Sequence, residues 1–276
     1  MGAIDLHARP SKDFEAKLAE TQALLIRAAS EFSPLTQASS LGAEDVVITH
    51  LINALELDIP VFVLETGMLQ PQTLELLERT EANSRAPVRV FRPMHEAVVQ
   101  FVAREGNEPM YRSVELRKAC CHIRKVEPLE RALAGQQAWI TGLRREQSNA
   151  RAEVPLIDTT DLRTKFNPLA NWSWGDVWHY IGVNKVDYNP LHDEFFPSIG
   201  CAPCTRAISL GEDFRAGRWW WEDENAKECG LHVKENTVRA EPFDNAQDRP
   251  VEALRPFDKL RTGQAQGERT SDRMNA

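Results

Sequence analysis

The chain lacks long apolar runs, a surplus of basic residues and any leader-like N-terminal pattern. Its longest apolar stretches, such as 59–64, are far too short to cross a bilayer. Lysine and arginine number 33 against 41 aspartates and glutamates, and the resulting charge of −8 disfavours nonspecific binding to nucleic acids or membranes. No basic segment precedes an apolar core at the N-terminus, so no signal peptide is visible. We therefore expect a cytoplasmic protein without nucleic-acid or membrane partners, in which an anionic substrate needs a locally basic pocket.

Cysteine is also scarce, and its five residues are unevenly spaced. Cys120 and Cys121 are adjacent, Cys201 and Cys204 enclose an Ala-Pro dipeptide, and Cys229 stands alone. In a reducing cytoplasm, paired cysteines are more often metal ligands or redox groups than structural disulfides. Two pairs and one singleton predict four ligands for one metal centre and one thiol left to react.

Short apolar runs that predict buried strands alternate with segments of helical spacing. This alternation is typical of an α/β protein with a mostly parallel sheet and helices on both faces. Ser11 is the expected N-cap of the first helix, and Pro128 should end or kink the longest one. The pattern loosens after Val154 and turns polar further on, so we expect one domain over residues 1–238 and a disordered tail over 239–276. The predicted strands are 35–39, 59–64, 88–91 and 138–141, and the predicted helices are 12–32, 46–55, 71–81, 95–105, 113–133 and 174–181.

Three predicted loops, 39–45, 65–67 and 142–145, follow strands at the edge where open parallel sheets bind ligands. Loop 39–45 places small residues where a helix begins, and free N–H groups there can hold a phosphate. A plain helix cap by Ser40 explains the same residues. Basic side chains in predicted loops can clamp phosphate or sulfate oxygens, although surface ion pairs explain them as well. The candidates are Arg124, Lys125, Arg144, Arg145, Arg151, Arg215 and Arg218.

The paired cysteines can bind either an iron–sulfur cluster or zinc, because both use four-cysteine sites. Their spacing does not select between the metals, and Cys201 with Cys204 could instead form a redox dithiol. Cys229 is the candidate nucleophile, with Gly230 beside it and His232 nearby. Thiolates attack sulfur readily, and nearby positive charge lowers the pKa of a thiol. The alternative for Cys229 is an inert thiol.

Taken together, these motifs resemble the assimilatory phosphosulfate reductase family, and specifically its cluster-containing branch, which reduces adenylyl sulfate (APS). The similarity runs from about residue 12 to about residue 232. The cysteine pairs are its most discriminating element, because relatives that use the 3′-phosphorylated substrate usually lack them. The segments that carry it are Ser-Leu-Gly-Ala-Glu-Asp at 40–45, Glu-Thr-Gly at 65–67, Cys-Cys-His-Ile-Arg-Lys at 120–125, Thr-Gly-Leu-Arg-Arg at 141–145, Tyr-Asn-Pro-Leu-His at 188–192, Cys-Ala-Pro-Cys at 201–204 and Glu-Cys-Gly-Leu-His at 228–232.

The resemblance implies an adenine-nucleotide α-hydrolase-like fold of the PP-loop type and a 4Fe-4S cluster on Cys120, Cys121, Cys201 and Cys204. It also implies that Cys229 attacks the sulfur of APS, that AMP leaves, and that thioredoxin or a similar dithiol protein then releases sulfite. The oligomeric state stays open, a homo-oligomer included. The substrate-binding positions that the resemblance implies are Ser39, Ser40, Gly42, Leu64, Thr66, Gly67, Lys125, Gly142, Arg144, Arg151, Arg215, Arg218 and His232.

Two features depart from the family pattern. Glu65 stands where family members often carry aspartate, and the sequence after about residue 238 matches no redox domain, so we expect an external reductant. We also expect the cluster to organise the site rather than pass electrons to the substrate. Three alternatives remain: a reductase for 3′-phosphoadenylyl sulfate, a cluster-dependent tRNA thiolation enzyme, and a non-catalytic nucleotide-binding module stapled by zinc.

Overall fold

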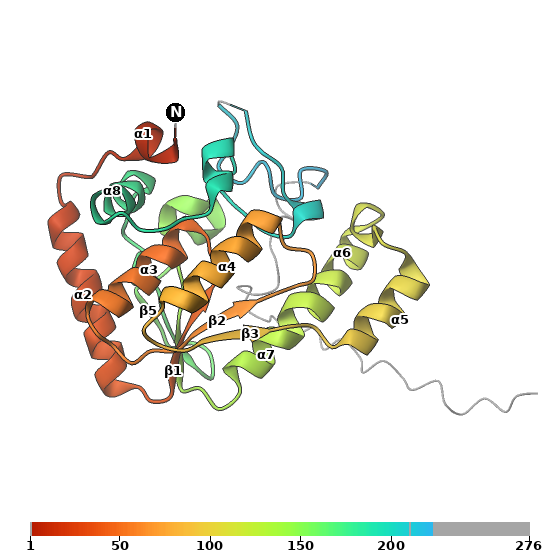
Figure 1. Cartoon of the computed structure of the whole chain (residues 1–276), viewed down its shortest axis with the longest axis horizontal. Coiled ribbons are helices and arrows are strands. Elements are labelled where there is room, and N and C mark those ends of the chain that lie inside the picture. Colours follow the sequence, from red (N-terminus) through yellow and green to blue (C-terminus); the bar gives the residue numbers. More distant parts are fainter. Residues whose placement is uncertain (1, 210, 223–276) are drawn as a thin grey trace, which may run out of the picture. The chain divides into compact units, whose positions relative to one another are not determined.

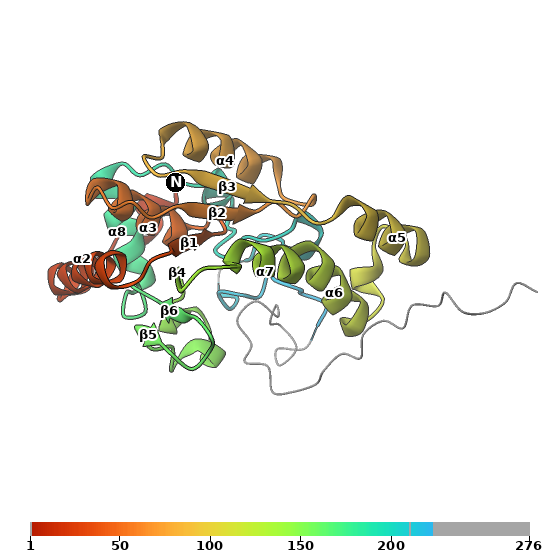
Figure 2. The same cartoon turned by 90° about the horizontal axis from the view of Figure 1, so that it is seen from below.

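The computed structural model describes residues 2–209 and 211–222. Among them, a six-stranded sheet has the order β3-β2-β1-β4-β6-β5, which Figure 2 shows from top to bottom. All neighbouring strands pair in parallel except β5, which is antiparallel to β6. The strands are β1 (Leu35–Ser39), β2 (Val61–Leu64), β3 (Val88–Phe91), β4 (Ala138–Ile140), β5 (Ile157–Asp158) and β6 (Thr164–Phe166).

Helices pack on both faces of the sheet, because successive strand residues point to opposite sides. Val63 and Ile140 face the main core, which α2, α3, α4 and α8 complete. Phe62 and Trp139 face the other way and pack against α7. Figure 1 shows α5 and α6 beyond one end of the strands. The helices are α1 (Ala3–His7), α2 (Phe14–Glu31), α3 (Ala43–Ala54), α4 (Pro71–Asn83), α5 (His95–Glu105), α6 (Val114–Cys121), α7 (Glu127–Leu133) and α8 (Trp174–Asn184).

The predicted mostly parallel sheet is confirmed, and its first four strands lie where the apolar runs placed them. Strands β5 and β6 were missed, because two and three residues are too short to show a period. Helix α3 begins at Ala43 rather than Val46. The predicted N-cap was wrong: Asp13 precedes α2, and Ser11 instead donates its N–H and Oγ–H to Asp176 Oδ1, at 2.6 and 2.8 Å.

The predicted helix over 113–133 is divided into three parts. Ser113 caps α6 by accepting the Leu116 N–H at 3.2 Å, a π-helical turn covers 122–126, and α7 completes the segment. Pro128 has no N–H for the carbonyl of Arg124, so the α-helical bonding cannot continue unchanged through it. The wider π-helical turn directly follows Cys121 and contains Lys125. Turns of this type are frequent at functional sites.

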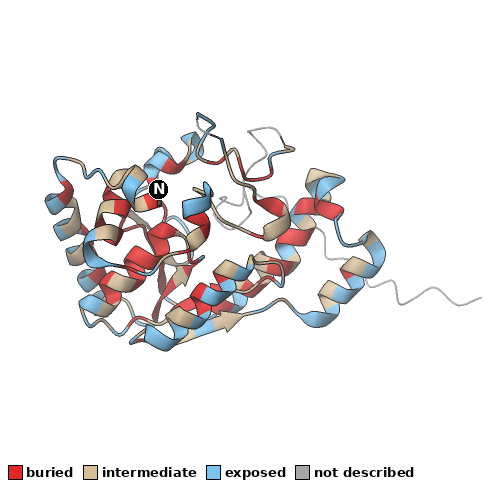
Figure 3. Cartoon of the chain, turned by 45° about the horizontal axis from the view of Figure 1, so that its top comes forward, coloured by how far each residue is buried: buried red, intermediate tan, exposed pale blue. Residues whose placement is uncertain are grey.

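Burial is concentrated on the helix faces turned toward the sheet, as the red segments of Figure 3 show. The four described cysteines are buried as well. The outer faces of α2 and α5 carry most of their charged residues and are exposed. Between residues 2 and 222, none of the described helices is long and apolar enough to cross a membrane.

Candidate active site

A cavity of about 220 Å³ lies at the carboxyl ends of the parallel strands. The loops after β1, β2 and β4 line it, together with segments 197–200 and 214–219. The chain passes from β1 through β2 to β3 on one side of the sheet and returns to β4 on the other side of β1. This is a topological switch point, where open α/β sheets bind their ligands.

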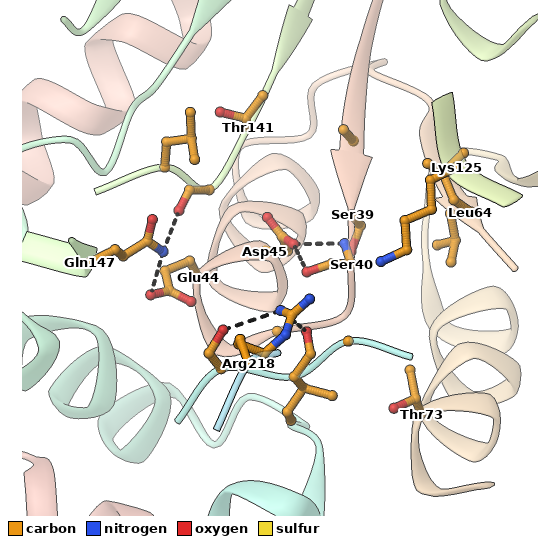
Figure 4. A pocket seen from close by; sticks show the side chains of 18 of the residues that line it. Ser39, Ser40, Glu44, Asp45, Leu64, Thr73, Lys125, Thr141, Gln147 and Arg218 are labelled. Carbon is orange, nitrogen blue, oxygen red and sulfur yellow. Dashed lines mark hydrogen bonds between the residues drawn. The ribbon is translucent and has the colours of Figure 1, made fainter. Parts of the chain in front are cut away.

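Asp45, at the start of α3, holds the loop after β1. Ser40 donates both its N–H and its Oγ–H to Asp45 Oδ2, at 2.7 and 2.6 Å (Figure 4). The Gly142 N–H also bonds this carboxyl group, whose burial raises the pKa of Asp45 to about 6. A Cβ at Gly142 would lie 2.4 Å from Asp45 Oδ1, so only glycine lets the loop after β4 approach α3 this closely. One carboxyl group therefore joins two of the predicted ligand loops.

Gln147 is a site residue that the sequence reasoning missed. Its Nε2 donates to Glu44 Oε1 at 3.0 Å and to the Gly142 carbonyl at 3.3 Å, and both bonds are drawn in Figure 4. Its Oε1 accepts a hydrogen bond from Arg151 Nη1 at 2.7 Å. Gln147 thus orients a cationic side chain of the cavity. A lone glutamine in a loop carries no sequence signal for this role, apart from its place within the segment after β4.

Among the described residues, four cationic side chains line the cavity: Lys125, Arg151, Arg215 and Arg218. Figure 4 shows Lys125 and Arg218 reaching toward the loop of Ser40 from different elements. Nη1 of Arg218 donates to the neutral acceptors Ser198 Oγ and Ile199 O, at 3.4 and 3.3 Å. Its buried Nε has no hydrogen-bond partner among the described residues. Arg218 therefore carries its charge against neutral oxygens at the cavity wall.

The other implied substrate positions divide into three groups. Ser39, Ser40, Gly42, Leu64, Thr66 and Gly142 line the cavity. Arg144 and Gly67 do not belong to its lining, although both lie in the loops that form it. His232 and the candidate nucleophile Cys229 lie outside the described residues.

Arg144 is engaged in a buried ion pair instead. Its Nε donates to Glu44 Oε1 at 2.9 Å, and its Nη1 donates to Glu146 Oε2 at 2.9 Å. Its Cζ lies 5.3 Å from the ring centroid of Trp174. These contacts join the loop after β4 to α3, so the geometry makes Arg144 a support of the cavity wall.

Gly67 serves the turn after β2. Its φ of +71° is in the left-handed region that glycine adopts without strain, and its N–H donates to Glu65 Oε1 at 2.6 Å. Glu65, the departure from the family pattern, also pairs with Arg92 at 3.2 Å. The Glu65 side chain, which is longer than that of aspartate, therefore both closes the turn and reaches the exposed Arg92.

The two cysteine pairs meet in one buried apolar cluster next to the cavity. Cys120 and Cys121 end α6, while Cys201 precedes a short 3-10 turn, Ala202–Cys204, that Cys204 ends. None of the four thiols is in a disulfide. Their buried apolar neighbours are Phe101, Met110 and Trp219. The sequence analysis predicted that the two distant cysteine pairs would meet, and the fold brings them together.

Polar groups contact Cys120 and Cys201 within this cluster. Arg124 hydrogen-bonds the Cys120 side chain, and Thr66 Oγ1 lies 3.3 Å from Cys201 Sγ. Burial and the neighbouring Cys201 raise the pKa of Cys204 to about 12, against the opposing charges of Lys125 and Arg218. Metal ligation uses the deprotonated thiolate, so binding of a metal at these thiols would release their protons.

Residues 34–207 match the phosphoadenosine phosphosulfate reductase domain family. The chain belongs to this family. It is 51% identical to adenosine 5′-phosphosulfate reductase of Allochromatium vinosum, over 78% of this chain and 85% of the relative. The enzyme of the same name from Burkholderia cepacia is 48% identical, over 80% of this chain and 89% of the relative. A third, from Neisseria meningitidis, is 52% identical over 71% and 81%.

One solved structure agrees with the family assignment, and a second agrees with the fold. Phosphoadenylyl-sulfate reductase from Candida auris, in a phosphate complex, has a TM-score of 0.57 at 29% identity and covers 66% of this chain and 88% of its own. Candida glabrata FMN adenylyltransferase, with FAD and inorganic pyrophosphate, has a TM-score of 0.51 at 14% identity, covers 81% and 80% of the two chains, and shares the fold alone. The predicted PP-loop-type α/β fold is therefore confirmed.

Proposed function

We propose that this member of the family reduces adenylyl sulfate to sulfite and AMP in assimilatory sulfate reduction. The observation that carries the proposal is one strand-end cavity that Lys125 and three arginines line, beside four buried cysteines. An acidic chain that gathers cations at one place is suited to a small anion. The three relatives named adenosine 5′-phosphosulfate reductase, at 48–52% identity, support this choice of substrate.

The nucleotide would lie against the loops after β1, β2 and β4. Gly42 is the N-cap of α3, with extended backbone at φ −74°, and the free N–H groups of that helix start favour an anion. The sulfate end would lie near Lys125, Arg151 and Arg218, where guanidinium groups can neutralise its oxygens and stabilise the phosphate leaving group.

The chemical step proposed here is a transfer of the sulfonate group to Cys229. Its thiolate attacks the sulfur of APS, the bond from sulfur to the bridging phosphate oxygen breaks, and AMP leaves with that electron pair. A thiolate of thioredoxin, or of a similar external dithiol, then attacks the Cys229 sulfur and expels sulfite. The second thiol of the dithiol closes a disulfide and frees Cys229. The dithiol therefore supplies both electrons.

We further propose that Cys120, Cys121, Cys201 and Cys204 hold a 4Fe-4S cluster. All four are thiols, all are buried, and polar donors lie around their sulfurs. Four-cysteine sites hold either an iron–sulfur cluster or zinc, and the resemblance to the cluster-containing branch of the family favours the cluster. The bound cluster would order the site, and neighbouring Lys125 would supply the positive field.

The test of this cofactor is anaerobic purification followed by iron and sulfide analysis. We expect four irons and four sulfides per protein chain. We also expect no change in cluster oxidation state during a single turnover with APS. Stoichiometric zinc without sulfide would refute the cluster. A change of oxidation state during turnover would refute its purely organising role.

The test of the reaction uses APS labelled in its sulfur. Without a dithiol, wild-type protein should retain label on one peptide, that of Cys229, and release one equivalent of AMP. Cys229→Ser should bind AMP as wild type does and retain no label. Label on another cysteine, or sulfite formation by Cys229→Ser, would remove Cys229 from the mechanism.

The second candidate is reduction of the 3′-phosphorylated nucleotide, which the likeness to the Candida auris enzyme favours. Comparing kcat/KM for the two nucleotides decides between them, and a strong preference for the 3′-phosphorylated one would overturn our choice. The tRNA thiolation alternative fits poorly with a net charge of −8.

A further inference from the structure

Arg117 joins the cysteine site to the last described part of the chain. It lies on α6 one turn before Cys121, and its side chain is 1% exposed. Its Nε and Nη2 donate to the two carboxylate oxygens of Glu222, at 2.9 and 2.8 Å, and the Glu222 side chain is 3% exposed. The guanidinium also hydrogen-bonds the Cys121 side chain. A buried bidentate pair of this kind holds two elements in one relative geometry.

The same guanidinium lies over the ring of Trp219, which the cavity arginines share. The Cζ atoms of Arg117 and Arg218 are 4.7 and 4.6 Å from its centroid, and that of Arg215 is 5.9 Å away. The backbone N–H of Trp219 donates to the Cys204 carbonyl at 3.3 Å. One buried indole therefore contacts the cysteine site and the arginines that line the cavity.

Glu222 is the last described residue before the candidate nucleophile, Cys229, in the sequence. Its N–H donates to the Trp219 carbonyl at 2.9 Å, so the carboxylate follows the indole within one turn. Cys229 comes seven positions later in the sequence. The Arg117–Glu222 pair thus fixes where this segment starts with respect to α6.

We propose that Arg117 is a positioning residue that couples occupation of the cysteine site to anion binding in the cavity. A metal bound at Cys121 would fix the position of the end of α6. Arg117 on this helix would then hold Trp219 and Glu222 in place. The Trp219 ring would in turn hold the Arg218 guanidinium in position for the anion. Coupling of this type is reciprocal, so nucleotide binding also favours the occupied cysteine site. The proposal rests on the proposed function for the identity of the anion and of the reactive cysteine.

The test is calorimetric titration of AMP into iron-loaded and iron-depleted protein. For wild type we expect iron loading to strengthen AMP binding about tenfold, a common size for coupling between sites. In Glu222→Gln and in Arg117→Lys, the ratio of the two affinities should fall close to one. A role in folding alone would weaken AMP binding equally in both iron states and leave the ratio unchanged.

A matched control is the exposed pair of Arg131 and Glu127 on α7, whose Nε–Oε1 distance is 2.6 Å. Arg131→Lys and Glu127→Gln should keep the wild-type ratio. As a second measurement, Cys229 in the iron-loaded, AMP-bound protein should react faster with a maleimide in Glu222→Gln than in wild type.

Two results would overturn the coupling. The first is a wild-type protein whose AMP affinity is the same with and without iron. The second is a wild-type affinity ratio in both Arg117→Lys and Glu222→Gln, together with unchanged Cys229 reactivity. Wild-type protein that binds no AMP in either state would overturn the proposed function and this inference together. AMP binding without coupling would overturn the inference alone.

Discussion

The cavity and the cysteine site are neighbours that are built in different ways. The cavity is formed by loops that follow adjacent strands, and its key contacts are short, such as Ser40 and Gly142 to the Asp45 carboxyl group. The cysteine site brings the end of α6 and a turn some 80 positions away, at Cys201 and Cys204, into one buried cluster. Sheet topology produces the first, whereas the second depends on the thiols and whatever binds them.

This difference predicts two kinds of variant. Changes in the strand-end loops should alter ligand binding and leave the metal in place. Changes among the cysteines should remove the metal and also disturb the cavity, because Trp219 belongs to both regions and Arg218 lies 4.6 Å from its ring centroid.

Cys201→Ser should abolish both iron binding and sulfite formation, because a missing thiolate removes one of four ligands from a buried centre. Iron and sulfide analysis with a turnover assay measures both. Cys229→Ser is the matched control and should keep its iron. Full iron content in Cys201→Ser would show that the ligand set is wrong.

Arg218→Gln should lower kcat/KM for APS by about 10²–10³, the usual cost of losing one buried donor to a developing charge. Its iron content should stay at the wild-type level, in contrast to the cysteine variant. Steady-state kinetics with iron analysis checks this. The control is Arg206→Gln, which breaks an exposed pair with Glu212 in the same segment and should change kcat/KM little. Equal effects in the two variants would contradict the anion site.

Gln147→Leu should raise KM for APS about tenfold and change kcat less, because it removes the hydrogen bond that orients Arg151. The measurement is the separate determination of KM and kcat. Gln100→Leu, on the exposed face of α5, is the control and should match wild type. A fall in kcat with constant KM would instead place Gln147 in the chemical step.

Asp45→Asn should change how the melting temperature depends on pH. The folded-state pKa of Asp45 is about 6, above its ordinary value of 3.8, because of burial. Its favourable contribution is therefore complete below about pH 4 and is lost as the pH rises through 6. Relative to wild type, the variant should gain a few degrees between about pH 4 and 7. Asp161→Asn, in an exposed loop, should show no such trend, and a flat difference for Asp45→Asn would contradict the buried titration.

The sequence was sufficient for the parts of this protein that depend on local pattern. Apolar runs separated by helical spacing predicted the first four strands and the mostly parallel sheet, and the cysteine spacing predicted that two distant pairs would meet. These features are encoded by short-range periodicity and by motifs, which can be read without any tertiary contact.

Tertiary structure decided the role of each charged or amide side chain. Arg144 and Arg218 look alike in the sequence, but Arg144 meets Glu44 in a buried ion pair, while Arg218 meets neutral acceptors and lines the cavity. Gln147 and Arg117 have no motif of their own and become informative only through the partners that folding brings to them. A charged side chain either stabilises the fold or is available to bind a ligand, depending on contacts between residues far apart in the sequence, such as Arg144 with Glu44. Only the folded chain contains these contacts.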